Sequence, residues 1–83
     1  MSQNYPNPFN PSTTIGYAIP YSANVTVKVL DVLGNEIETP VNEEKSPGTY
    51  ELTWHAENLP SGVYFYRLQA RDFIETKKML LLK

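Results

Sequence analysis

The single histidine of the chain is the first residue to consider for chemistry. His55 follows Trp54 and precedes Glu57 by two positions, and an imidazole near a carboxylate could act as a general base or hold a metal. Either role needs further groups, such as a nucleophile with an orienting partner or additional metal ligands. The sequence has no second histidine and no cysteine to supply them. We therefore interpret His55 as a surface residue and predict no catalytic residue, no metal site and no cofactor.

The acidic residues are the second candidate group. Glu36 with Glu38, and Glu43 with Glu44, could suggest a pair of catalytic carboxylates or a calcium site. A calcium loop alternates Asp or Asn ligands around a turn glycine, and no stretch of the sequence shows this pattern. We interpret these glutamates as solvated charges. The sequence thus predicts a protein that is not an enzyme.

The aromatic residues could instead bind sugars. An exposed platform of Trp54 and tyrosines would stack on carbohydrate or on cations. However, Trp54 alternates with Leu52, and Tyr64 and Tyr66 share one strand face with Leu68. This alternation favours packing in a core.

Length and composition indicate one folded domain. The 83 residues are too few for two independent cores, and a hydrophobic content of 41% is enough for one. The formal net charge of −2 provides no basic surface, so we predict no nucleic-acid partner. No apolar run approaches the roughly 20 residues that span a membrane, and the first residues do not resemble a signal peptide.

Alternating side chains predict β-strands along most of the chain. The predicted strands are residues 13–19, 25–30, 36–41, 48–54, 63–68 and 73–82. Pro40 confines the third strand to a sheet edge, and residues 42–47 are expected to form a solvated loop. Asp31 is expected to accept backbone amide hydrogen bonds in the turn that contains Gly34 and Asn35. The predicted fold class is all-β, an Ig-like antiparallel β-sandwich of about six to seven strands.

The first residues differ from the rest. The run QNYPNPFNP contains three prolines, which remove backbone donors and exclude a helix. We predict that residues 1–11 form an extended Pro/Asn-rich lead-in, pinned to the sandwich by the rings of Tyr5 and Phe9. Residues 12–83 are then a single β-sandwich domain. The abrupt start of this motif suggests a segment taken from the end of a longer polypeptide.

The closing strands carry an unusual pattern. Residues 59–68, LPSGVYFYRL, join a turn to an aromatic strand, and residues 79–82, MLLL, are apolar on both faces. An outer strand of a small sandwich normally exposes one face to water, so either the protein covers both faces or a partner covers one. Lys77, Lys78 and Lys83 border the run with positive charge, which limits self-association and could meet an acidic receptor.

Three passages of the chain together resemble one known family. They are YPNPFNPSTTIGYAIP near the start, VKVLDVLGNEI in the middle, and LPSGVYFYRL followed by KKMLLLK at the end. They are similar to the C-terminal sorting domain, type A, of the type IX secretion system, the Por secretion tail of Bacteroidetes and related bacteria. The likeness extends from about residue 3 to residue 83, and motif order, spacing and terminal position all agree.

The resemblance implies a targeting signal that directs an attached N-terminal cargo across the outer membrane. In the family, an outer-membrane translocon and its shuttle protein recognise the domain, and a sortase-like protease commonly removes it. The implied localisation is exported, first in the periplasm in transit and then at the cell surface or outside the cell. The recognised residues implied here are Gly62, Val63, Tyr64, Lys78, Met79, Leu80, Leu81, Leu82 and Lys83. We expect the last strand to offer unpaired backbone groups that can add to a receptor's sheet.

Two other functions stay open at this point. The domain could be an accessory carbohydrate- or surface-binding Ig-like module, which requires aromatic residues clustered on an exposed face. It could also be a passive Ig-like spacer of a larger secreted enzyme, in which the closing strand matters for stability alone.

Overall fold

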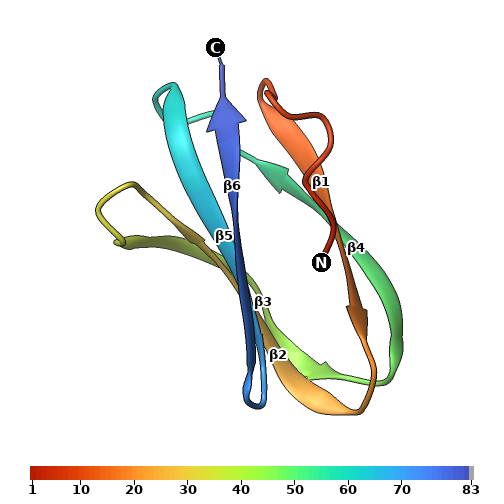
Figure 1. Cartoon of the computed structure of the whole chain (residues 1–83). Coiled ribbons are helices and arrows are strands. Elements are labelled where there is room, and N and C mark those ends of the chain that lie inside the picture. Colours follow the sequence, from red (N-terminus) through yellow and green to blue (C-terminus); the bar gives the residue numbers. More distant parts are fainter. Residues whose placement is uncertain (83) are drawn as a thin grey trace.

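The protein folds as two layers of β-strands. The computed structural model describes residues 1–82, and every regular element in that part of the chain is a strand (Figure 1). The strands are β1 (Ser12–Ile19), β2 (Ala23–Leu30), β3 (Glu36–Lys45), β4 (Gly48–His55), β5 (Gly62–Ala70) and β6 (Phe73–Leu81). The prediction of an all-β antiparallel sandwich is confirmed.

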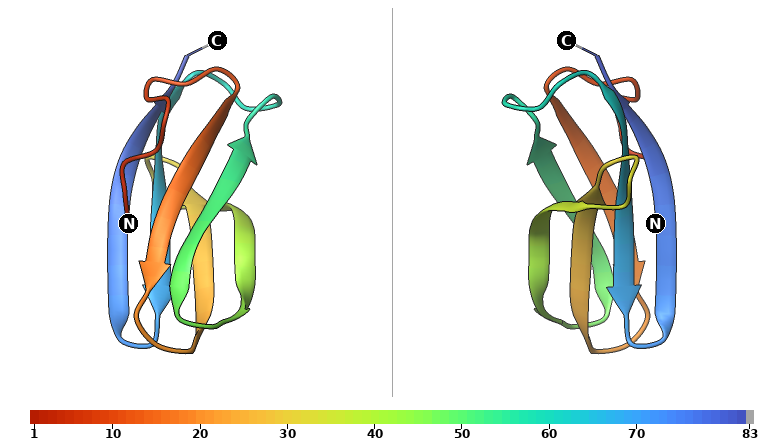
Figure 2. Two further views of the ribbon diagram at one scale, coloured as in Figure 1. Left: turned by 90° about the vertical axis from the view of Figure 1, so that its right-hand side faces the viewer. Right: turned by 90° about the vertical axis from the view of Figure 1, so that its left-hand side faces the viewer.

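The two layers differ in size. β1 and β4 form a two-stranded sheet, and the other strands form a four-stranded sheet in the order β3-β2-β5-β6. Neighbouring strands are antiparallel in both sheets. The side views in Figure 2 show the sheets facing each other. β3 and β6 are the edges of the larger sheet, which confirms the edge position predicted for β3 from Pro40.

Alternate side chains of the strands fill the space between the sheets. The three valines on the inner face of β2 are fully buried, and Tyr66 of β5 is 0% exposed. Trp54 of the smaller sheet is 1% exposed and meets Tyr64 of the larger sheet edge-on, with ring centroids 6.2 Å apart. Large rings dominate the apolar area buried in a domain of this size. The core role predicted for Trp54, Tyr64 and Tyr66 is confirmed.

β3 extends beyond its predicted end. Residues 42–45 were expected in a solvated loop, but they continue the strand and pair with residues 23–26 of β2. The expectation is wrong because an edge strand needs backbone pairing on one side only, and its charged side chains can point to water. Pro40 lies where the register between β2 and β3 shifts, at a position that tolerates its missing N–H.

Asp31 organises the turn between β2 and β3, as predicted. Its Oδ1 accepts hydrogen bonds from the backbone amides of Leu33 and Asn35, each at 2.9 Å. These bonds, led by the Asn35 amide, hold the pKa of the Asp31 carboxyl below its usual range. Gly34 adopts a φ of 86°, which glycine reaches without a steric penalty.

The lead-in, residues 1–11, lies along the seam between the two sheets, beside β1 and β6 (Figure 2, left). Tyr5 and Thr14 of β1 exchange two backbone hydrogen bonds of 2.9 and 2.8 Å. Phe9 forms a parallel bridge with Leu81 of β6. The Phe9 side chain is 2% exposed, as predicted, whereas Tyr5 is 81% exposed. The prediction for Tyr5 is wrong because its backbone, and not its ring, makes the attachment.

Candidate functional site

The residues that the resemblance singles out meet at one end of the larger sheet. Antiparallel pairing joins the start of β5 to the end of β6, residue by residue: Gly62 with Leu81, Val63 with Leu80, Tyr64 with Met79, and Phe65 with Lys78. Leu82 directly follows the last residue of β6. Lys83 lies outside the described residues. The structure therefore brings together the predicted residues that it describes.

The end of β6 has an inner and an outer face. Met79 and Leu81 are 0% exposed and belong to the core. Leu80 and Leu82 are 36% and 49% exposed, and Lys78 is also exposed. The apolar run thus covers part of the core with one face and meets solvent with the other. In the folded domain a partner can reach Lys78, Leu80 and Leu82, whereas Met79 and Leu81 act through the fold.

Neighbouring strands extend the outer apolar face. Val63, directly opposite Leu80, and Phe65, two residues further along β5, are both half-buried. Leu30 of β2 lies opposite Phe65 and is 5% exposed. Because directly opposed side chains in a sheet are within contact distance, Leu80 lies beside Val63, and Lys78, Phe65 and Leu30 form a row across three strands. We call Lys78, Leu80, Leu82, Val63 and Phe65 the outer patch.

The outer edge of β6 is closed at this end. The Leu80 carbonyl accepts a hydrogen bond from the Phe9 N–H at 3.0 Å, and the Leu82 N–H donates to the Phe9 carbonyl at 3.0 Å. The Leu80 N–H donates to the side-chain carbonyl of Asn7, also at 3.0 Å. The expectation of unpaired backbone groups is wrong at these positions, because the lead-in occupies them.

Buried polar groups anchor the lead-in to the sandwich. The Tyr66 hydroxyl accepts a hydrogen bond from the Asn4 N–H at 2.7 Å and donates to the Ser2 carbonyl at 3.0 Å. The Asn4 side chain donates to the Thr13 hydroxyl at 2.9 Å and to the Pro6 carbonyl at 3.1 Å. Burial raises the pKa of Tyr66. Within residues 1–82, each buried side-chain nitrogen and oxygen has a hydrogen-bond partner.

The polar contacts of the lead-in escaped the sequence analysis. Asn4 bonds to β5 and β1, whereas Asn7 and Gln3 reach β6, where the Gln3 side-chain amide donates to the Lys78 carbonyl at 2.8 Å. A signal was present in the run NYPNPFNP, where asparagines alternate with prolines. Asparagine side chains carry both donors and acceptors, which can bond where proline has no N–H.

Gly62 contributes a backbone conformation at the start of β5. Its φ is 154°, and a Cβ at this position would meet no atom within 4 Å. Space is therefore available, but L side chains rarely adopt this φ. We conclude that Gly62 allows the chain to enter β5 in the register that places Val63 beside Leu80.

The other candidates from the sequence are surface residues. His55 is exposed, and its Nδ1 lies 3.7 Å from a Glu57 carboxylate oxygen. The four glutamates of β3 are also exposed, as predicted. Across the described part of the chain, no group of three or more His, Asp or Glu side chains is placed to hold a metal ion.

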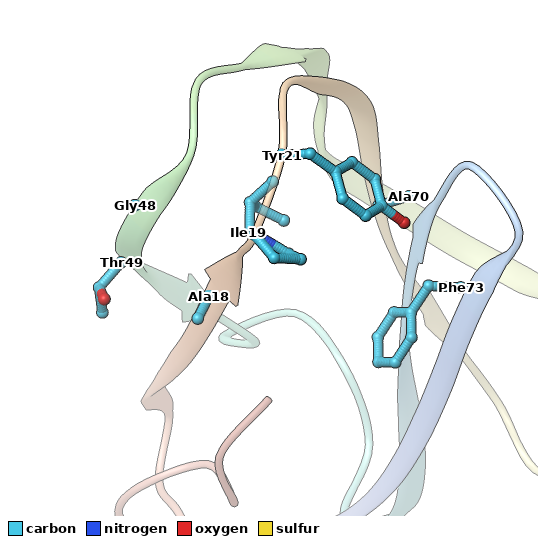
Figure 3. Close-up of a pocket in the computed structure, with 8 residues that line it drawn as sticks. Ala18, Ile19, Tyr21, Gly48, Thr49, Ala70 and Phe73 are labelled. Carbon is cyan, nitrogen blue, oxygen red and sulfur yellow. The ribbon is translucent and has the colours of Figure 1, made fainter.

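An apolar pocket of about 530 Å³ opens at the other end of the sandwich (Figure 3). Its lining residues are Ala18, Ile19, Pro20, Tyr21, Gly48, Thr49, Ala70 and Phe73. Phe73 begins β6, whereas the outer patch occupies the second half of that strand and the start of β5. None of the predicted recognition residues that the structure describes lines it.

A small β-sandwich whose predicted site lies on its closing strands is typical of a binding or targeting module. The sequence profile of the family described as the secretion system C-terminal sorting domain matches residues 3–82. The chain therefore belongs to this family, and it is a C-terminal sorting signal of the type IX secretion system. No curated protein and no solved structure matches the chain.

Family membership fixes several properties of the protein at a coarse level. The domain works with the type IX secretion machinery and with a cargo attached on its N-terminal side. The protein is exported to the cell surface or beyond. The family is one of sorting signals and is not known for catalysis. In residues 1–82, no helix has the length and apolar character needed to cross a membrane.

Proposed function

We propose that the secretion machinery reads the folded domain through the outer patch. One observation carries this proposal: the pairing of β5 with β6 gathers Lys78 and Leu80 with Val63 and Phe65 on one face, and the exposed Leu82 directly follows β6. The proposed readers are the outer-membrane translocon and its shuttle protein. The proposed recognition residues also include Lys83, which continues the chain beyond the described part.

The chemistry of the outer patch suits a protein partner. Leu80 and Leu82 are large apolar side chains held on or next to an ordered strand, and removing them from water favours binding by roughly 25 cal/mol per Å². The Lys78 ammonium group can pair with an acidic group of a receptor, which would set the orientation of the complex. Tyr64, Met79 and Leu81 support this surface from the core side.

We also infer the steps around recognition. The domain performs no chemistry of its own, the cargo passes through the periplasm, and a sortase-like protease removes the domain after delivery. The role of the family as a sorting signal supports these steps.

The test uses a fluorescent reporter fused before residues 3–83, with an inner-membrane export signal, in a host that has a type IX system. Deletion of residues 79–83 would remove Met79 and Leu81 from the core, and so would confuse misfolding with lost recognition. The sharper variant is Leu80→Asp with Leu82→Asp, which changes exposed side chains. We expect this variant to fold, to accumulate in the periplasm and to lose surface delivery.

Ile74→Asp is the matched control. Ile74 is 57% exposed and shares the outer face of β6, but it lies at the start of the strand, away from the outer patch. This control should be delivered like the parent. Equal delivery of the Leu80→Asp/Leu82→Asp variant and the parent would refute recognition through the outer patch.

A further inference from the structure

The lead-in occupies the position of an additional strand on the edge of β6. Phe9 bonds to both Leu80 and Leu82 through its backbone, in a parallel bridge centred on Leu81. A second strand added by a receptor would need the same edge. We propose that recognition proceeds by exchange, in which a receptor segment displaces the lead-in and takes its place along β6. This inference rests on the proposed reading of β6 by the secretion machinery.

The lead-in is a poor strand, which makes it exchangeable. Pro6, Pro8 and Pro11 lack an N–H, so residues 3–11 cannot donate a continuous ladder of backbone bonds. Its bonds to the edge of β6 are two backbone bonds at Phe9 and two side-chain bonds, from Gln3 and to Asn7. A proline-free segment could pair its backbone at each of these positions.

The edge also offers more groups than the lead-in uses. Backbone groups of a strand point to alternate sides, so Leu80 and Leu82 share their outward direction with Ile74, Thr76 and Lys78. β6 has no neighbouring strand on that side in the described structure, because β5 is its partner in the sheet. A longer receptor segment could therefore pair with the strand from Leu82 back toward Ile74.

The Phe9 side chain defines what the incoming segment must carry. Phe9 is 2% exposed, and the centroids of the Phe9 and Trp54 rings are 5.9 Å apart, so the Phe9 ring fills part of the core. Removal of the lead-in without replacement would leave a cavity and exposed apolar surface at this point. The partner that fits is an extended segment that runs parallel to β6 and inserts an aromatic or other bulky apolar side chain at the Phe9 position.

A disulfide tests whether the lead-in must leave. Tyr5 and Thr14 exchange two backbone bonds, and the Cα atoms of such pairs lie about 5.5 Å apart, within the range for a disulfide. Because the chain has no natural cysteine, Tyr5→Cys with Thr14→Cys allows a single cross-link. The loss of folding stability should be small at Tyr5, because its side chain is exposed. The single variants Tyr5→Cys and Thr14→Cys are the matched controls.

If a receptor segment must displace the lead-in, the cross-link should have two effects. Hydrogen exchange at the Leu80 and Leu82 amides, measured on the purified domain, should slow relative to the single variants because the lead-in opens less often. Surface delivery of the reporter should fall by roughly tenfold or more, because apparent affinity scales with the fraction of molecules that can open. Both single variants should be delivered like the parent.

The possible outcomes separate this proposal from the proposed function. The cross-linked domain could be delivered normally while the Leu80→Asp/Leu82→Asp variant still loses delivery. That result would overturn displacement of the lead-in and would leave recognition through the outer patch in place. Normal delivery of both would reject recognition through the outer patch itself. If the cross-link leaves hydrogen exchange at the Leu80 and Leu82 amides unchanged, the proposed displacement of the lead-in is also overturned. A purified dimer held by swapped lead-ins would overturn it as well, because the occupant of the edge would then be a second copy of the chain.

Discussion

At the scale of single residues, Tyr66 ties β5 to the lead-in. Its hydroxyl bonds to the backbone of Asn4 and Ser2, which are 62 and 64 residues away in sequence. The Tyr66 side chain is 0% exposed and Asn4 is 2% exposed, so the Asn4 N–H would lose its partner in a buried place if the hydroxyl were removed. A buried group left without its partner costs about 1–3 kcal/mol.

We expect Tyr66→Phe to lower the free energy of unfolding by about 1–3 kcal/mol, measured by urea denaturation near neutral pH. The pH dependence should change as well. Because burial raises the folded-state pKa of Tyr66, its contribution to stability is present below the unfolded pKa of about 10 and is lost as pH rises through the folded pKa. The variant should therefore lose less stability than the parent in strongly alkaline solution. Identical alkaline profiles would show that the pKa of Tyr66 is the same in the folded and unfolded states, which would contradict the effect of burial.

Tyr64→Ala should cost about 3–5 kcal/mol of unfolding free energy, because the ring is 5% exposed and packs on Trp54. Its hydroxyl also donates to the Pro60 carbonyl at 2.7 Å, which ties the turn to β5. Tyr5→Ala is the control, since Tyr5 is 81% exposed, and it should change stability by less than about 0.5 kcal/mol. Similar losses in both variants would contradict the assignment of Tyr64 to the core.

At the scale of elements, β6 combines a stabilising inner face with a solvent-exposed outer face, for which recognition is proposed. The alternation predicts that Leu81→Ala costs about 2–5 kcal/mol, because Leu81 is 0% exposed, and that Leu80→Ala costs clearly less, because Leu80 is 36% exposed. Urea denaturation of the two variants measures the difference. Equal costs would mean that the outer face of β6 is covered in the free domain.

The elements were largely predictable because their side chains alternate. The inner valines of β2 and the tyrosines of β5 follow a strict period of two, and their strands lie where the pattern places them. Polar strand residues such as Glu43 and Glu44 give no such signal, since pairing with β2 and not burial keeps them in β3. The division of the chain into residues 1–11 and 12–83 stays a prediction.

The candidate site was predictable in part. The resemblance located the end of β6 and the start of β5, and the pairing of the strands brings them together. The cover over this edge was not predictable, because it depends on long-range bonds from Asn7 and Phe9 to Leu80. Such contacts do not produce a periodic pattern of apolar residues in the sequence of either segment. The alternation of Asn with Pro was the one local hint.

At the scale of the whole molecule, the two edges of the larger sheet are protected in different ways. β3 carries four exposed glutamates and a register shift, and both features discourage pairing with another chain. β6 is covered at one end by the lead-in and is bordered by Lys77 and Lys78. This asymmetry favours β6 over β3 as the edge to which the proposed receptor segment adds.

The ratio of surface to periplasmic reporter in the Leu80→Asp/Leu82→Asp variant tests the central claim most directly. Thermal unfolding of the purified domain first establishes that the variant folds like the parent. We predict that the reporter then remains in the periplasm, while the Ile74→Asp control reaches the surface. A folded variant that reaches the surface as well as the parent does would contradict the claim that the secretion machinery reads this face of the closing strand.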